Sequence, residues 1–280
     1  MRTIHTKKIT EAVRKMCMEA NYFLSDDVRS AIINAKEKEE SAIGKEILDD
    51  LIKNADIAKE EEIPVCQDTG MAVFFVKVGQ KVKIKGGLLT DAINKGVSLG
   101  YTDGYLRKSV LTDPIRRQNS GDNTPAVIHY DIVEGDKLEI TFAPKGFGSE
   151  NMSALKMLKP SDGIEGVKQF VIDTVKNAGS NPCPPIVVGV GIGGTMDKCA
   201  CLAKYALTRS LDERNPDPCY RELENELLDK INELDIGPQG FGGKTTALAV
   251  NVETYATHIA GLPCAVNINC HVTRHKTVIL

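Results

Sequence analysis

The spacing of apolar residues divides the chain into a helical first part and a longer part in which strands and helices alternate. Over residues 1–62 the apolar positions recur at helical spacing, and polar caps at Ser25 and Ser41 indicate where new helices begin. In the rest of the chain, short apolar or alternating runs bounded by glycine are typical of strands. We therefore expect a mixed α/β fold. A helical N-terminal region at 1–62 is followed by an α/β body with a mixed sheet at 63–280, as one continuous domain over residues 1–280.

The α/β body is expected to contain both strand pairs and strand–helix units. Strands are predicted at residues 71–79, 81–86, 126–133, 137–144, 184–194, 245–255 and 264–272. Helices are predicted at residues 89–97, 163–178, 195–209 and 220–234. Glu134-Gly135-Asp136 separates two of these strands, and a short polar turn with glycine predicts a β-hairpin.

Composition and charge exclude several classes of function. The 280 residues are 42% hydrophobic and 26% charged, which is ordinary for a globular protein. The 35 basic residues nearly balance 38 acidic ones, so the net charge of −3 leaves no global basic field to hold nucleic acid or an anionic membrane. No apolar run has the length of a signal peptide or a membrane span. We expect a cytoplasmic protein that binds neither nucleic acid nor membranes.

Two glycine-rich segments resemble nucleotide-binding loops but depart from them. Gly189–Gly194 has G-x-G-x-x-G spacing between a strand and a helix, yet no acidic residue ends a following strand, because Asp212 lies in a turn after the helix. Gly240–Thr246 fails the Walker A spacing by one residue, because Pro238 stands at the first glycine. Its backbone N–H groups and Lys244 still form a candidate anion site. An NAD-binding oxidoreductase therefore remains an alternative of a different class.

Eight cysteines are the unusual feature of the composition. In an intracellular chain of this length, cysteines favour metal binding or catalysis over a disulfide framework. No C-x-x-C pair occurs, so any metal site would use cysteines that lie far apart in the sequence. Cys199 and Cys201 are two apart on a predicted helix and point in different directions, so we assign them to packing. Packing is also the expected role of Cys17 and Cys219.

Glycine and polar residues gather in seven segments between ordinary helices and strands, which is typical of a site carried by loops. The segments are VCQDTG (65–70), LRKS (106–109), NSGDNTP (119–125), PKGFGSENMS (144–153), NPCPP (181–185), GFGGKTT (240–246) and LPCAVNINCHVTRH (262–275). In this order they resemble the alpha subunit of the class I iron–sulfur fumarases and the related L-tartrate dehydratases, over nearly the whole chain.

The resemblance implies the reversible addition of water across the double bond of a dicarboxylate, with a [4Fe–4S] cluster as the cofactor. The three cluster ligands of the family correspond to Cys66, Cys183 and Cys270, and Cys264 lies six residues before the last of them. Three thiolates would leave one iron open to bind substrate oxygens as a Lewis acid. The alternative for these cysteines is burial as small hydrophobic residues.

The same resemblance implies roles for residues near the cluster. Gln67 and Asp68 directly follow the first ligand, so their side chains would reach a substrate on the open iron; Asp68 is the candidate acid/base and Gln67 the residue that orients the substrate. The alternative for Asp68 is a turn with the two residues that follow it. Arg107 corresponds to a substrate-binding arginine, and a guanidinium is the natural bidentate partner of a carboxylate. Further substrate-binding candidates are Gly146, Phe147 and Gly148, through their backbone, and Lys244.

Other basic residues and histidines carry less weight, because single Arg and Lys side chains are usually only solvated. These basic residues are Arg116, Arg117, Lys145 and Arg274. His129 is expected to be a structural residue within a strand. The spacing of His271 and His275 after Cys270 fits no standard zinc finger.

We expect a partner to complete the site. By the resemblance, a beta subunit supplies further basic residues and part of the acid/base machinery, so this chain alone should have little or no activity. A dimer of alpha–beta pairs and a small dicarboxylate substrate are also implied. Fumarate and malate are the expected substrates, and L-tartrate is the alternative. A non-catalytic scaffold subunit is the alternative of another class.

Overall fold

The computed structural model describes residues 1–280, which fold into two units. Each unit is assembled from separate stretches of the chain. The first unit consists of residues 1–24, 55–147 and 274–280. The second unit consists of residues 25–54 and 148–273.

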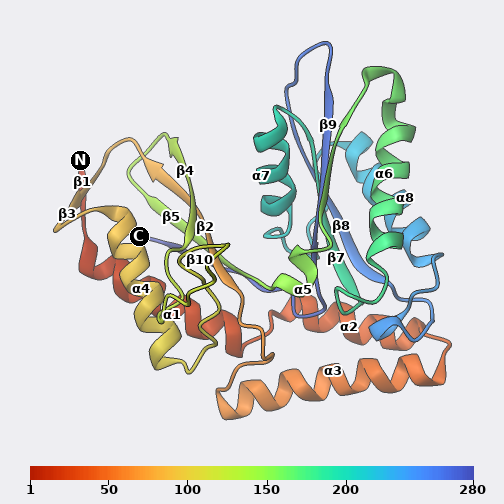
Figure 1. Ribbon diagram of the computed structural model, residues 1–280, viewed down its shortest axis with the longest axis horizontal. Helices are drawn as coiled ribbons and strands as arrows, with labels where there is room; N and C mark the ends of the chain where they lie inside the picture. The colour runs from red at the N-terminus through yellow and green to blue at the C-terminus, as the bar shows by residue number, and fades with distance from the viewer. The chain divides into compact units, whose positions relative to one another are not determined.

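The first unit contains a four-stranded sheet and two packed helices. Its elements are β1 (Arg2–His5), α1 (Thr6–Tyr22), β2 (Met71–Gly79), β3 (Val82–Lys85), α4 (Leu89–Asp103), β4 (Val127–Val133), β5 (Leu138–Lys145) and β10 (Lys276–Ile279). The sheet order is β10-β5-β2-β4, and β1 pairs separately with β3. Helices α1 and α4 lie against each other beside this sheet (Figure 1). They approach closely because Gly96 and Gly100 of α4 leave room for Val13 and Cys17 of α1.

The position of β2 corrects the hairpin expected at residues 134–136. β4 and β5 do not pair with each other, because β2 lies between them, parallel to β4 and antiparallel to β5. Five successive residues of β2, Ala72–Val76, are buried, which is typical of a central strand, whereas β4 is largely exposed at the sheet edge. Phe74 of β2 and Phe142 of β5 pack in the core with ring centroids 5.0 Å apart.

The second unit is a four-stranded sheet with helices on both faces. Its elements are α2 (Asp26–Lys38), α3 (Ala42–Glu61, which continues into the first unit), α5 (Phe147–Glu150, which begins in the first unit), β6 (Ala154–Leu158), the 3₁₀ turn η1 (Pro160–Asp162), α6 (Gly163–Ala178), β7 (Ile186–Gly193), α7 (Met196–Ala206), α8 (Pro218–Asn232), the 3₁₀ turn η2 (Pro238–Gly240), β8 (Ala247–Tyr255) and β9 (Leu262–Asn269). The sheet order is β6-β9-β7-β8. Helix α7 covers one face of this sheet, and α6 and α8 cover the other (Figure 1).

The glycines of β7 serve packing against α7. A Cβ atom at Gly189 would lie 2.1 Å from the carbonyl oxygen of Ala203, and one at Gly191 would lie 2.1 Å from that of Cys199. Only glycine lets the helix backbone approach the strand so closely. Both glycines lie within the strand rather than in a phosphate-binding turn. Helix–sheet contact therefore explains the first two glycines of the G-x-G-x-x-G segment, while the third, Gly194, has a φ of 69° in the turn that follows β7.

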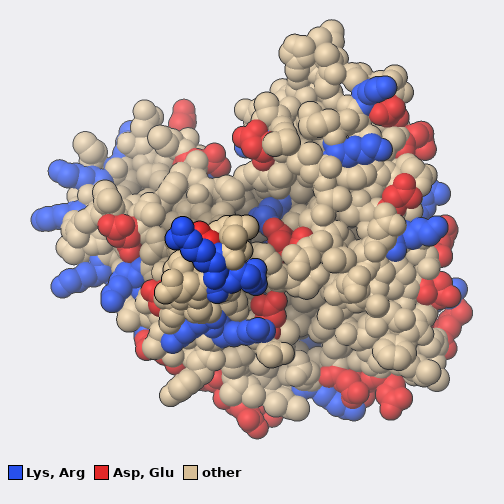
Figure 2. Space-filling view, in the orientation of Figure 1, with Lys and Arg blue, Asp and Glu red and all other residues tan.

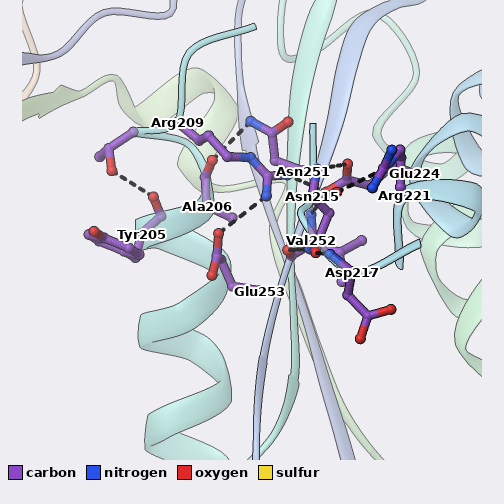
Figure 3. Close-up of polar contacts among 11 residues, drawn as sticks. Tyr205, Ala206, Arg209, Asn215, Asp217, Arg221, Glu224, Asn251, Val252 and Glu253 are labelled. Atoms are coloured by element: carbon purple, nitrogen blue, oxygen red, sulfur yellow. Dashed lines mark hydrogen bonds and ion pairs between the residues drawn. The ribbon is translucent and has the colours of Figure 1, made fainter. Parts of the chain in front are cut away.

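A buried ion-pair network joins α8 to β8 (Figure 3). Glu224 of α8 is 2% exposed and accepts hydrogen bonds from Arg209 and from the backbone N–H groups of Asn215 and Val252. Glu253 lies 3.4 Å from Arg209; burial raises the pKa of the Glu253 carboxyl, and the Arg209 cation opposes this shift. Because both oxygens of Glu224 have partners within the chain, we assign this cluster to structure.

The structure confirms the expected mixed α/β fold with a helical N-terminal region. The helices within residues 1–62 are divided between the units, since α1 packs in the first unit and α2 belongs to the second. Strands β1, β6 and β10 are not among the predicted ones. Each has only four or five residues and pairs with a single neighbouring strand, so its sequence pattern is short.

Basic and acidic side chains lie among each other on the face shown in Figure 2, in keeping with the net charge of −3. None of the helices combines the length and the apolar character that crossing a bilayer requires.

Candidate functional site

Buried side chains hold the loop Cys66–Gly70 of the first unit by its carbonyl groups. The loop follows α3 and leads into β2. The carbonyl oxygens of its last three residues accept hydrogen bonds from Arg274, Tyr101 and Asn123, which are all buried. Burial also raises the pKa of the Tyr101 hydroxyl well above its usual range, so it remains a donor. The carbonyl groups thus face the core, while the side chains of the first three loop residues remain accessible.

Two backbone N–H groups fix the Asp68 carboxylate. Oδ1 accepts from Gly70 at 2.9 Å, which is the turn expected as the structural alternative for this residue, and Oδ2 accepts from Phe147 at 2.9 Å. A Cβ atom at Gly146 would lie only 3.2 Å from Oδ2, so glycine allows this approach. Each carboxylate oxygen keeps a second lone pair, so the group is oriented and can still accept a further hydrogen bond.

Thr69 ties the backbone of Arg107 to the same loop. The Thr69 hydroxyl accepts the N–H of Arg107 at 2.9 Å and lies 3.3 Å from the Arg107 carbonyl oxygen, to which it donates. The Arg107 side chain is exposed. The first unit therefore places an accessible guanidinium on the segment bound to the loop that carries Cys66 and Asp68.

Cys183 and Cys270 of the second unit lie on loops that contact each other. His271 donates its backbone N–H to the Cys183 carbonyl at 3.3 Å, and its Nδ1 lies 3.0 Å from the same oxygen. The Gln239 side chain donates to the Pro184 carbonyl at 2.7 Å and contacts Nδ1 of His271 at 3.1 Å. Cys183 has a φ of 55°, in the left-handed region that favours glycine.

The cysteines differ in their accessibility, which decides whether a thiol can reach a metal. None of them forms a disulfide. The fully buried ones are Cys17, Cys199 and Cys264. Burial raises the pKa of these thiols, to about 11 for Cys199 and about 12 for Cys264, so they stay protonated at neutral pH and are poor ligands. The three candidate cluster ligands are exposed or partly exposed: Cys66, Cys183 and Cys270. Accessible thiols can serve as iron ligands, so these three meet that requirement, as Cys201 and Cys219 also do, whereas the buried Cys264 does not.

A carboxylate of the chain itself occupies the turn at Lys244. Glu39 is 1% exposed; its Oε1 accepts the N–H of Lys244 at 3.0 Å and its Oε2 that of Thr245 at 3.2 Å. Oε1 also accepts from Glu40 and Ser41. The anion site expected from the glycine-rich segment therefore exists, but Glu39 fills its backbone donors. The Lys244 side chain is exposed, with Nζ 3.6 Å from Glu40.

Replacing Glu39 with glutamine should lower the free energy of unfolding by about 3 kcal/mol at neutral pH, because hydrogen bonds to a buried charged group are lost and an amide NH₂ faces an N–H donor. Burial would raise the pKa of Glu39, but the N–H groups of Lys244, Ser41, Glu40 and Thr245 favour the ionised form and lower it. The carboxylate thus stabilises the fold above its ordinary pKa of 4.5, and this contribution is lost as the pH falls through the lower folded-state value. Urea unfolding over a pH series measures both effects.

The matched control is Glu40→Gln, since the Glu40 side chain is 76% exposed and meets only Lys244. We expect its effect to stay within about 0.5 kcal/mol. The difference between the wild type and Glu39→Gln should shrink in acid. Equal losses for the two variants, or a difference that persists at low pH, would contradict the role of Glu39.

The structure groups the predicted site residues by unit. The first unit contains Cys66, Gln67, Asp68, Arg107, Gly146 and Phe147, and the second contains Gly148, Cys183, Lys244 and Cys270. Gly148 is placed near the Cys183 loop, since a Cβ atom there would lie 3.7 Å from the Asn181 carbonyl oxygen. Within each unit, no group of three or more His, Cys, Asp or Glu side chains is arranged to hold a metal ion. His129 stacks on Phe75, as expected of a structural histidine.

Sequence reasoning missed the residues that support the loops from inside. Tyr101 occupies an ordinary helical position and has no signal in the sequence. Asn123 lies in the polar segment 119–125; it accepts the N–H of Ser109 at 2.7 Å and has a φ of 62°. The polar character of that segment was a usable signal for Asn123, but its partner was not predictable.

Comparison with known proteins shows which family contains chains similar to this one. Residues 10–279 match the family described as Fumarate hydratase (Fumerase). A relative from Methanocaldococcus jannaschii, named "Putative L(+)-tartrate dehydratase subunit alpha", is 45% identical over 273 residues, which cover 95% of each chain. The L(+)-tartrate dehydratase subunit alpha of Escherichia coli (strain K12) is 33% identical over 276 residues, covering 98% of this chain and 91% of the relative. On these matches, the chain belongs to the fumarate hydratase family.

Proposed function

We propose that this chain is the alpha subunit of a [4Fe–4S] hydro-lyase that reversibly adds water to a small dicarboxylate, with fumarate and L-malate as the leading pair. The observation that carries the proposal is the Cys66–Gly70 loop. It holds an accessible thiol and an oriented carboxylate, and Thr69 binds it to the backbone of Arg107. Membership of the family and the names of the relatives support this class of reaction.

The proposed cluster ligands are Cys66, Cys183 and Cys270. Their accessibility supports the assignment, and so does the strained backbone of Cys183. Arg274 follows Cys270 in the sequence with three residues between them. Its guanidinium donates to the carbonyl of Asp68, which lies two residues after Cys66. When bound, the cluster would supply an iron without a protein ligand as a Lewis acid toward substrate oxygens.

In this proposal Asp68 exchanges a proton with the substrate as water is added or lost. The Phe147 N–H at Oδ2 and the Gly70 N–H at Oδ1 hold the carboxylate in one orientation, which is what general acid/base catalysis requires. Because its N–H is engaged by Asp68, Phe147 acts on the substrate through that carboxylate. Gln67 is exposed beside Asp68 and orients the substrate through its amide.

The remaining proposed residues neutralise and orient the two carboxylates. Arg107 binds one of them through its exposed guanidinium. Gly146 and Gly148 contact a carboxylate through their backbone. Lys244 contributes only its exposed ammonium, since its N–H is bound to Glu39.

Dehydration of L-tartrate is the second candidate, and the names of the relatives favour it. Tartrate carries the same two carboxylates with one more hydroxyl than malate, so the residues above serve either substrate. The "subunit alpha" in those names supports a beta subunit as the partner that completes the site, and we propose a dimer of alpha–beta pairs.

The test is anaerobic co-expression of the chain with its partner subunit, followed by measurement of kcat/KM for fumarate, L-malate and L-tartrate. We expect the complex to hold four irons per alpha chain, to turn over at least one of these substrates, and to lose activity in air because no thiolate protects the open iron. The alpha chain alone should show only a trace of activity. A complex that binds no iron, or that converts none of the three substrates, would overturn the proposal.

A further inference from the structure

Arg274 is buried in the first unit, yet it uses only part of its hydrogen-bonding capacity. The residue is 5% exposed, and its Nη2 donates to the carbonyl of Asp68. Its Nε and Nη1 are buried and have no hydrogen-bond partner in the chain. A guanidinium carries five N–H donors, and buried polar groups are nearly always satisfied. An acceptor for this side chain is therefore missing from the chain itself.

The charges buried in the first unit indicate that the missing acceptor is an anion. Arg274 is a buried cation of this unit, and none of the unit's Asp or Glu residues is buried. Asp68 is only partly buried, directs its oxygens to the N–H groups of Gly70 and Phe147, and meets Arg274 through its carbonyl group alone. A buried cation without a counter-ion is costly, so an anion should complete this group in the working protein.

Arg274 and Arg107 are held in opposite ways. Arg107 has a fixed backbone and an exposed side chain, as expected of a residue that meets a ligand arriving from solvent. Arg274 has a side chain that is itself fixed, in a region shielded from water, where a preoriented cation acts on an anion more strongly than it would at the surface.

We propose that Arg274 is an anion-binding residue of the site: it holds an anionic acceptor against the Cys66–Gly70 loop while its Nη2 keeps the peptide of Asp68 in place. The acceptor is a carboxylate oxygen of the dicarboxylate or an anionic sulfur of the cluster, and both accept charge-assisted N–H hydrogen bonds. The identity of this anion rests on the proposed function. The lack of acceptors for Nε and Nη1 of Arg274 is an observation that does not depend on it.

The experiment compares Arg274→Met and Arg274→Lys with the wild type in the anaerobically reconstituted complex with the partner subunit. Arg14→Gln is the matched control, because Arg14 is an arginine of the same unit whose ion pairs with Glu11 and Asp103 lie at the surface. Two quantities are measured in each protein. One is the Kd of succinate, a dicarboxylate that cannot react, by calorimetry. The other is the rate at which a chelator removes iron.

If the acceptor is a substrate carboxylate, Arg274→Met should raise the succinate Kd about 10- to 100-fold, the loss expected for one charge-assisted contact, while iron release stays unchanged. If the acceptor is cluster sulfur, iron release should become about 10-fold faster or more, with the succinate Kd of loaded protein unchanged. In either arm Arg274→Lys should recover part of the loss. If Arg274→Met matches Arg14→Gln in both quantities, the proposal is wrong.

Circular dichroism establishes whether each variant folds. If Arg274→Met does not, Arg274→Lys decides, because it keeps the charge but lacks the planar set of donors; wild-type values for both quantities would then overturn the proposal. A wild-type complex that holds no iron and binds no succinate contradicts the proposed function instead. In that event, titration with inorganic phosphate tests Arg274 alone: affinity lost in the variants supports the anion site, and equal affinity in all proteins overturns it.

Discussion

Replacing Cys66, Cys183 or Cys270 with serine should remove the cluster and lower the turnover of the assembled enzyme about 10³-fold, because a Lewis-acid metal contributes several kcal/mol to such a reaction and each tenfold in rate is about 1.4 kcal/mol. The serine hydroxyl is nearly the size of the thiol, but it does not ionise at neutral pH to become a ligand. Iron and sulfide analysis after anaerobic reconstitution measures the cluster, and steady-state kinetics measures the turnover.

Cys219→Ser is the matched control, since Cys219 is exposed like Cys183 but lies at the start of α8. It should keep both iron and activity. A second control is Cys264→Ser, because Cys264 lies six residues before the proposed ligand Cys270. Cys264 is fully buried in β9, so this variant should lose stability and keep its iron. Full iron content in any of the three ligand variants, or loss of iron in Cys219→Ser, would contradict the assignment of these three cysteines as cluster ligands.

Local periodicity was sufficient to predict most elements of the fold but not their neighbours. β2 and α6 lie where the pattern predicts them, because a continuous apolar run or a helical stripe is a local property. The pairing of β4 and β5 with β2 depends instead on which strand takes the central position in the sheet. A polar turn between two strands does not show whether a third strand lies between them. The division into two units depends on contacts between distant segments and has no local signal either.

The candidate site shows the same limit. Its polar loop segments stand out in the sequence, because glycine, proline and polar residues interrupt the regular pattern. What fills or supports those loops comes from elsewhere in the chain. Glu39 lies about 200 positions before the turn that it occupies. Arg274 reads in sequence as one more solvated basic residue, and only its burial and its vacant donors distinguish it from Arg116.

Asp68→Asn should lower kcat about 10³-fold with little change in KM, within the range that general acid/base groups contribute. The amide has nearly the shape of the carboxylate but cannot exchange a proton at neutral pH. Its NH₂ would face one of the two N–H donors, of Gly70 or Phe147, so a modest loss of stability is also expected. Steady-state kinetics measures the catalytic effect as separate values of kcat and KM.

Asp113→Asn separates the catalytic effect from the structural one. Asp113 also lies in the first unit and also accepts two backbone N–H groups, those of Ile115 and Arg116, but it lies outside the proposed site. Its variant should share the modest loss of stability and keep kcat. If Asp68→Asn retained most of the wild-type kcat, or if iron content fell in parallel with kcat, Asp68 would be a loop-forming residue only. The proton would then have to move through a group of the partner subunit.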